Sequence, residues 1–153
     1  MGEVRFTSEI AAPIGDVFHA HVDGPRIPEW FPGVRSIEGQ SGPLDRVGTT
    51  YSLRFTRLIA GRCEVVAVDP PRFHERTWNS KPLGSAGRAT MRFFEAGGGR
   101  TRIDFHARYS LPFGPLGKLA DRLPAIRGRA ERDMRREIDS FKDFVERGAR
   151  AAG

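Results

Sequence analysis

The chain has 153 residues, enough for one domain of ordinary size and too few for two. Its 39% hydrophobic and 29% charged residues are typical of a globular protein and exclude a disordered or fibrous chain. The single cysteine, Cys63, excludes an internal disulfide and a zinc site built from several cysteines. Because no run of about 18 apolar residues occurs and residues 1–10 lack a signal-peptide core, we expect a soluble, cytoplasmic protein.

The chain carries 25 basic and 19 acidic residues, which gives a net charge of +6. Such an excess permits contact with nucleic acid or with an anionic membrane. Nearly all of the basic residues are arginines, spread along the sequence with their main concentration at Arg122–Arg136. The charge alone favours a solvated surface over a binding patch, and we do not expect nucleic acid as a partner.

The first part of the chain predicts one strand and two short helices. Residues 4–10 alternate between apolar and polar side chains, which is typical of a strand, and Pro13 follows them. In residues 14–22 the apolar side chains recur at helical spacing. Gly24-Pro25 ends this helix, and residues 26–30 are long enough for only one or two further helical turns.

Alternating apolar rows predict further strands at residues 51–55, 62–67, 89–93 and 103–109, and residues 72–79 are a further predicted strand whose inward face is unclear. Ala60-Gly61 separates the first two of these strands, so we expect a hairpin there. Asp69-Pro70-Pro71 and Gly97-Gly98-Gly99 are predicted turns. Short turns at regular spacing indicate an antiparallel sheet with one apolar and one solvated face.

The last third of the chain changes to helical spacing. Apolar residues recur every three or four positions from Leu116 to Val145. Pro124 suits a first helical turn, so we expect the main helix at residues 124–147, with a short helical piece before it and Gly148 as its end. These elements predict a single α+β domain over residues 1–153, in which a curved antiparallel sheet of about seven strands wraps around the long helix.

A curved sheet of this size leaves room beside a single helix. The helix is only about 10 Å wide, so it cannot cover the whole concave face, and the remaining space predicts an internal cavity. The candidate ligand-binding residues come from the inward rows, the neighbouring strand and loop, and the helix: Trp30, Tyr51, Leu53, Phe55, Glu75, Arg76, Trp78, Met91, Phe93, Phe105, Tyr109, Met134 and Ile138.

Several segments of the chain, in order, resemble a known family. Ile10-Ala11-Ala12-Pro13, Asp16-Val17-Phe18 and Pro28–Val34 resemble the opening of START-like, or SRPBCC, helix-grip proteins, and most of all their polyketide cyclase/dehydrase-like subgroup. Asp69–Arg72 and the run Thr101–Phe105 after the glycine turn follow the same pattern. The resemblance covers nearly the whole chain. It implies a deep cavity that holds an apolar or aromatic molecule, such as a lipid, a quinone or a polyketide-like compound. Its motifs mark turns and packing, so it supplies no catalytic residues.

The strand at residues 72–79 carries charges whose orientation the sequence leaves open. If Arg76 and Trp78 point inward, the cavity holds a cation beside an aromatic ring, which suits a carboxylate or an enolate. If Glu75 points inward, its buried carboxyl group needs a partner and its pKa is raised. For any single strand, charges that point outward are the commonest arrangement.

The aromatic candidates each have a second interpretation. Trp30 either stacks on a ligand at the cavity mouth or packs against the sheet, and the large area that an indole buries favours packing. Tyr51 and Tyr109 fall on inward rows, where a phenol can orient a ligand carbonyl or act as a general acid. Alternatively, each phenol bonds to backbone or water at the rim of the cavity.

No metal or cofactor is predicted. His19 and His21 are two positions apart in a helix, so they face in different directions and cannot share a metal ion. Cys63 has no evident base partner and is interpreted as a small core residue. Gly97-Gly98-Gly99 lacks the lysine and the helix of a phosphate-binding loop.

Three functions are compatible with these features. The leading one is the binding of a hydrophobic or aromatic small molecule in the cavity. The second is a polyketide cyclase/dehydratase-type enzyme, which needs an ionisable group inside the cavity, and the sequence leaves such activity undecided. The third is an interaction module that uses the basic stretch Arg127–Arg136 on a membrane, a ribosome or a nucleic acid. The apolar segment Leu111–Leu116 has three interpretations: a gate at the cavity rim, a tip that dips into a membrane, or a hydrophobic staple that packs the start of the helix. The oligomeric state is not predicted.

Overall fold

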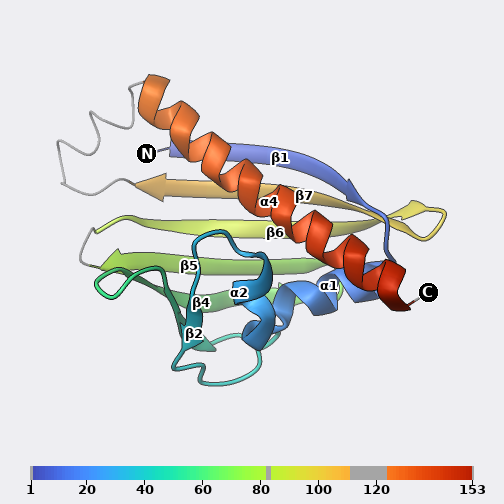
Figure 1. The fold of residues 1–153 in the computed structure, drawn as a ribbon, viewed down its shortest axis with the longest axis horizontal. Helices are drawn as coiled ribbons and strands as arrows, with labels where there is room; N and C mark the ends of the chain where they lie inside the picture. The colour runs from blue at the N-terminus through green and yellow to red at the C-terminus, as the bar shows by residue number, and fades with distance from the viewer. Residues whose placement is uncertain (1, 82–83, 111–123, 153) are drawn as a thin grey trace.

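Seven antiparallel strands form one curved sheet, and a long helix crosses one face of it (Figure 1). The structure, a computed structural model, describes residues 2–81, 84–110 and 124–152. The strand order is β1-β7-β6-β5-β4-β3-β2, so the first strand pairs with the last. The elements in chain order are β1 (Gly2–Ile10), α1 (Ile14–Val22), the 3-10 helix η1 (Gly24–Arg26), α2 (Ile27–Trp30), β2 (Ser36–Glu38), β3 (Thr50–Arg54), β4 (Ala60–Asp69), β5 (Phe73–Lys81), β6 (Ala86–Gly97), β7 (Arg100–Ser110) and α4 (Pro124–Ala152).

The curved antiparallel sheet, the two short helices after the first strand and the long terminal helix are confirmed, with three differences. The three-residue strand β2 is too short to show an alternating pattern. The hairpin between β3 and β4 turns at residues 55–59, and Ala60 and Gly61 already belong to β4. Helix α4 continues through Gly148 to Ala152, because one glycine costs only about 1 kcal/mol within a helix. The predicted helical piece before Pro124 and the segment Leu111–Leu116 lie outside the described residues.

A β-bulge at Val66 fixes which side chains of β4 and β5 face the helix. Val65 pairs with Arg76, whereas Ala67 pairs with Glu75, so the extra residue shifts the register between the two strands. Because facing residues in antiparallel strands lie on the same side of a sheet, Arg76 shares the inner face with the fully buried Val65. Glu75 lies on the outer face.

The hydrophobic core is concentrated under the second half of α4. Ile138, Phe141 and Val145 are buried there, and the Phe141 ring meets the Trp30 ring of α2 at 4.8 Å between centroids. The described side chains of α4 from Pro124 to Arg136 are all exposed or half-buried. The first half of the helix therefore covers the sheet without filling the space between them. Within the described ranges, no helix is both long and apolar enough to cross a membrane.

Candidate functional site

A cavity of about 250 Å³ lies between the sheet and the first half of α4. Its walls come from Phe31, which follows α2, from strands β3 to β7 with residues next to them, and from α4. Asp133, which is exposed, belongs to the lining, so the cavity reaches solvent beside the helix. The residues that line it are Phe31, Leu53, Phe55, Gly61, Cys63, Arg76, Trp78, Ser80, Ser85, Ala89, Phe105, Tyr109, Ala130, Asp133, Met134 and Glu137.

A buried ion pair joins the two walls of this cavity. Nη2 of Arg76, on β5, donates to Oε1 of Glu137, on α4, over 3.1 Å. The two side chains are only 11% and 10% exposed, and the guanidinium also lies 5.6 Å from the centre of the Phe31 ring. Burial raises the pKa of Glu137, and the attraction of Arg76 offsets part of that effect. The cavity thus combines largely apolar walls with one fixed cation and one fixed carboxyl group.

Tyr51 and Cys63 surround the guanidinium from the sheet. The Tyr51 phenol and the Cys63 thiol both lie near the Arg76 guanidinium, and Cys63 pairs with Tyr51 across β3 and β4. Burial raises the pKa of the Tyr51 phenol and of the Cys63 thiol. Both groups therefore stay protonated at neutral pH, and neither is a reactive anion.

Seven of the residues predicted from the sequence line the cavity: Leu53, Phe55, Arg76, Trp78, Phe105, Tyr109 and Met134. Five others are buried in the core around it: Trp30, Tyr51, Met91, Phe93 and Ile138. For Trp30 this is the packing interpretation, since its ring contacts Phe31, Phe141 and His21.

The candidate ligand-binding residue Glu75 does not line the cavity. Its carboxylate lies on the outer face of the sheet, where it accepts hydrogen bonds from Nη1 of Arg88 at 3.0 Å and from Oγ1 of Thr90 at 2.9 Å. The register set by the bulge gives the reason, because it turns Arg76 inward and leaves its neighbour outward. Of the two orientations that the sequence left open for this strand, the structure has the one with Arg76 and Trp78 inside.

Glu137 is the functional candidate that the sequence analysis missed. It falls in the apolar stripe of α4, three residues after Met134 and four before Phe141. A carboxylate at that spacing faces the same side of the helix as its apolar neighbours. The spacing therefore contained the signal, and the missing information was a buried cation opposite it.

Two histidines lie behind the ion pair. Nε2 of His74, on β5, is 2.9 Å from the carbonyl oxygen of Leu44, which makes this nitrogen the donor. The His21 ring, on α1, meets the His74 ring edge-on at 4.9 Å, and Nδ1 of His21 has no hydrogen-bond partner among the described residues. Burial lowers the pKa of His74 to about 4 and lowers that of His21 well below its usual range. Both imidazoles are therefore neutral at pH 7.

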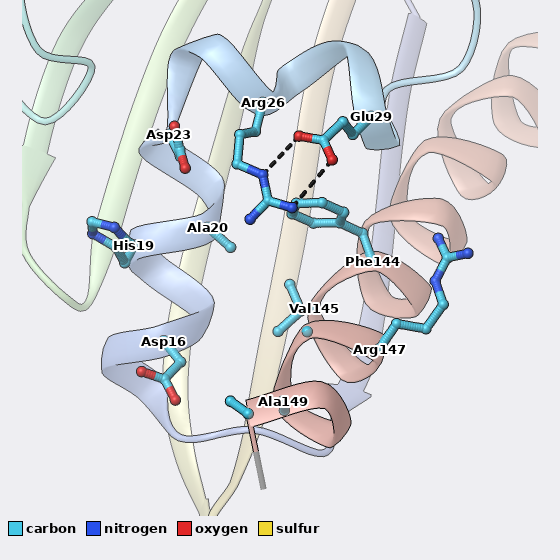
Figure 2. A pocket seen from close by; sticks show the side chains of 12 residues that line it. Asp16, His19, Ala20, Asp23, Arg26, Glu29, Phe144, Val145, Arg147 and Ala149 are labelled. Atoms are coloured by element: carbon cyan, nitrogen blue, oxygen red, sulfur yellow. Dashed lines mark hydrogen bonds and ion pairs between the residues drawn. The ribbon is translucent and has the colours of Figure 1, made fainter.

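A larger groove of about 780 Å³ lies on the surface between α1, α2 and the end of α4 (Figure 2). Arg26 and Glu29, both from the η1–α2 segment on one side of the groove, form a two-pronged ion pair at 2.7 and 3.1 Å, and Arg26 lies over the Phe144 ring. Both charged side chains are more than half exposed, and they bond to each other at the protein surface. This groove offers no buried polar group to a ligand, and we assign the site to the internal cavity. Among the described residues, no cluster of His, Cys, Asp and Glu side chains suits a metal ion.

A curved antiparallel sheet that holds a cavity against one long helix defines a helix-grip protein. The model of the family described as polyketide cyclase / dehydrase and lipid transport matches residues 1–146, and the chain belongs to this family.

Solved structures share the fold at low sequence identity. The Zhui aromatase/cyclase from Streptomyces sp. R1128 has a TM-score of 0.79 and 18% identity, over 99% of this chain and 97% of that one. DynU16, a putative protein of the dynemicin biosynthetic locus, has a TM-score of 0.71 and 18% identity, over 97% of this chain and 48% of that one. The di-domain aromatase/cyclase StfQ of the steffimycin pathway has a TM-score of 0.69 and 18% identity, over 96% of this chain and 46% of that one. The chain thus spans about half the length of the last two. No curated protein matches the sequence.

Proposed function

We propose that the protein binds a compact, largely apolar small molecule that carries one anionic or carbonyl oxygen, and that this oxygen is held by Arg76. The observation that carries the proposal is the Arg76–Glu137 pair, buried in a cavity with mainly apolar walls. Ligand sites in proteins combine apolar surface with a few fixed polar groups that orient the ligand. We further propose that the protein works in the cytoplasm.

The size of the cavity limits the ligand. Its volume of about 250 Å³ lies just below the range of roughly 300–1,000 Å³ that is usual for drug-sized ligands. This favours one or two rings, such as an aromatic polyketide fragment or a quinone ring, over a lipid with two acyl chains. Trp78 and Phe105 provide flat apolar walls for such rings.

Arg76 can hold Glu137 and a ligand together. A guanidinium has five N–H donors, and the contact with Glu137 Oε1 uses the Nη2 group. A hydrogen bond to a charged group contributes about 1.5–3 kcal/mol, which is enough to choose between ligands of equal apolar area. Arg76 therefore sets the selectivity for an oxygen, while the walls provide most of the affinity.

Binding of 2-naphthoate, compared with naphthalene-2-methanol, tests this proposal by calorimetry. We expect the protein to bind 2-naphthoate at least about tenfold more tightly, because only the carboxylate makes a charge-assisted bond to Arg76. In an Arg76→Met/Glu137→Met variant the cavity stays apolar and the two compounds should bind equally. Equal binding by the unmodified protein, or an undiminished preference in the variant, would contradict the proposal. Native mass spectrometry of the purified protein would then identify any ligand that it retains.

A second candidate is a cyclase/dehydratase-type enzyme, and the raised pKa of Glu137 beside Arg76 favours it. A carboxyl group with a raised pKa is a better general base when ionised, and a guanidinium stabilises an enolate. The step would move the α-proton of a ketone to Glu137 and return a proton from the same group, with the enolate oxygen on Arg76.

Deuterium exchange at the α-carbons of 2-tetralone in D₂O, followed by NMR, tests this enzymatic step. The protein should accelerate the exchange, and a Glu137→Gln variant should lower the acceleration by about 100-fold or more, since positioned general bases contribute about 10²–10⁴-fold. Val47→Gln, at an exposed surface position, is the control for an unrelated substitution. Exchange at the uncatalysed rate would leave binding alone as the function.

A further inference from the structure

The first half of α4 carries a concentration of positive charge beside the cavity. Five arginines occur between Pro124 and Arg136 with two acidic residues, and all seven side chains are exposed. Between Asp139 and Arg150 the three basic and three acidic residues balance. The exposed arginines are Arg127, Arg129, Arg132, Arg135 and Arg136.

An ordered loop at the tip of the β3–β4 hairpin holds a leucine in solvent. Leu58 is 81% exposed, which is the highest value among the large apolar side chains described. The N–H of Phe55 donates to the carbonyl of Ile59 over 3.0 Å, and Oγ1 of Thr56 accepts from the N–H groups of Leu58 and Ile59. Nη1 of Arg54 also donates to the carbonyl oxygens of Thr56 and Arg57. These bonds fix the loop, so Leu58 is presented outward by a rigid tip.

The exposed arginines of α4 and the hairpin tip that carries Leu58 lie on two sides of the same cavity. Phe55 and Gly61, on either side of the tip, line the cavity, and so do Ala130 and Met134 of α4. Figure 1 shows that α4 begins at the end of the sheet where β5 ends and β6 begins, and the β3–β4 turn lies at this end because β4 pairs antiparallel with β5. Both rims of the cavity therefore lie at the same end of the sheet.

We propose that this end of the molecule docks on an anionic lipid bilayer. The arginines of α4 contact the headgroups, and Leu58 enters the interface between headgroups and acyl chains. Charge alone suits several anionic partners, but a fixed aliphatic side chain at the same end of the sheet as these cations suits a bilayer, which offers both an anionic surface and an apolar layer. Docking has one consequence for the ligand, and this consequence rests on the proposed function. An apolar ligand passes between the bilayer and the cavity without crossing water.

Vesicle sedimentation tests the electrostatic part of the docking. The protein should bind phosphatidylcholine vesicles that contain phosphatidylserine and not vesicles of phosphatidylcholine alone. Each arginine near an anionic surface contributes about fivefold to binding, so an Arg129→Ser/Arg132→Ser/Arg136→Ser variant should bind about 100-fold more weakly. The control is Arg147→Ser/Arg150→Ser, at the other end of the same helix, which should weaken binding by much less than the roughly 25-fold expected for two arginines at the docking surface. Equal losses in the two variants, or no binding to either kind of vesicle, would overturn the proposal.

A fluorescent label tests the orientation of the docked protein. Cys63 is buried, so a nitrobenzoxadiazole label reacts selectively at an introduced cysteine. The label on a Leu58→Cys variant should brighten on anionic vesicles, whereas the label on Val47→Cys should not. Val47 is 57% exposed and lies before β3, at the opposite end of that strand from the hairpin tip. If the label at position 58 stays dim while polyglutamate competes fully with the vesicles, the surface belongs to an acidic protein and the bilayer proposal fails.

The Arg76→Met/Glu137→Met variant separates docking from ligand binding. It should bind anionic vesicles as the unmodified protein does, even if the proposed ligand selectivity is wrong. Loss of vesicle binding in this variant, with unchanged circular dichroism, would contradict docking through the exposed rims.

Discussion

A Glu137→Leu variant is expected to lose about 3–5 kcal/mol of its free energy of unfolding, because it leaves the Arg76 guanidinium buried without its carboxylate. Burial disfavours the charged form of Arg76, but Tyr51 and Glu137 raise its pKa, so this group does not escape the cost by losing its proton. An Arg76→Met/Glu137→Leu variant removes both charges and should be about as stable as the unmodified protein. Urea unfolding of the three proteins measures the effect.

The matched control for this prediction is the exposed Arg26–Glu29 pair. Both side chains are more than half exposed, so Glu29→Leu should change the stability little. The single variant Arg76→Met gives a further signature. Its remaining buried carboxyl group has a raised pKa in the folded protein, so stability is present at low pH and is lost as the pH rises above about 4.5. Equal stability losses for Glu137→Leu and Glu29→Leu would show that the ion pair is not buried as described.

Acidification from pH 6.5 towards pH 4 is expected to destabilise the protein by at least about 3 kcal/mol. Burial is the main cause of the lowered pKa of His74, which falls from 6.5 to about 4; the bond to Leu44 and the charge of Asp45 oppose this effect, and Arg76 adds to it. His21 is shifted in the same direction by burial, by His74 and by Arg76. Since the unfolded chain binds these protons and the folded protein does not, stability is complete above pH 6.5 and falls as the pH is lowered.

Urea unfolding at several pH values between 4.5 and 6.5 measures this dependence. A His21→Phe/His74→Gln variant should show a flatter dependence, because it removes both buried imidazoles. Gln is chosen at position 74 because its amide can still donate to the Leu44 carbonyl. The control is His19→Gln, which removes an exposed imidazole from the same helix and should leave the dependence unflattened. An equally steep pH dependence in the double variant would assign the acid sensitivity to other groups.

Most of the fold was predictable because its elements have clear periods. The inner rows of β3, β6 and β7 alternate regularly, and the apolar stripe of α4 continues to Val145. Orientation was not predictable for β5, where polar and aromatic residues occur on both faces. Its register depends on the bulge at Val66, which is a property of strand pairing and leaves no mark in the pattern of β5 itself.

The candidate site was predictable in its apolar walls and less so in its charges. Arg76 was foreseen as one of two possibilities, whereas the pairing with Glu137 joins residues 61 positions apart. No local pattern brings such residues together. Trp30 and Phe93 were both candidates for the cavity lining, although packing was the favoured interpretation of Trp30, because a large aromatic residue on an inward face can line a space or fill it. In the folded protein they fill it, since helices α1 and α2 cover that end of the sheet.

The uneven burial of α4 gives its two halves different local stabilities. The second half is tied to the core by Ile138, Phe141 and Val145, whereas the described side chains before Glu137 bury little surface. Opening the first turns therefore breaks few tertiary contacts and requires much less free energy than global unfolding. We expect fraying of this helix end to widen the mouth of the cavity while the rest of the domain stays folded.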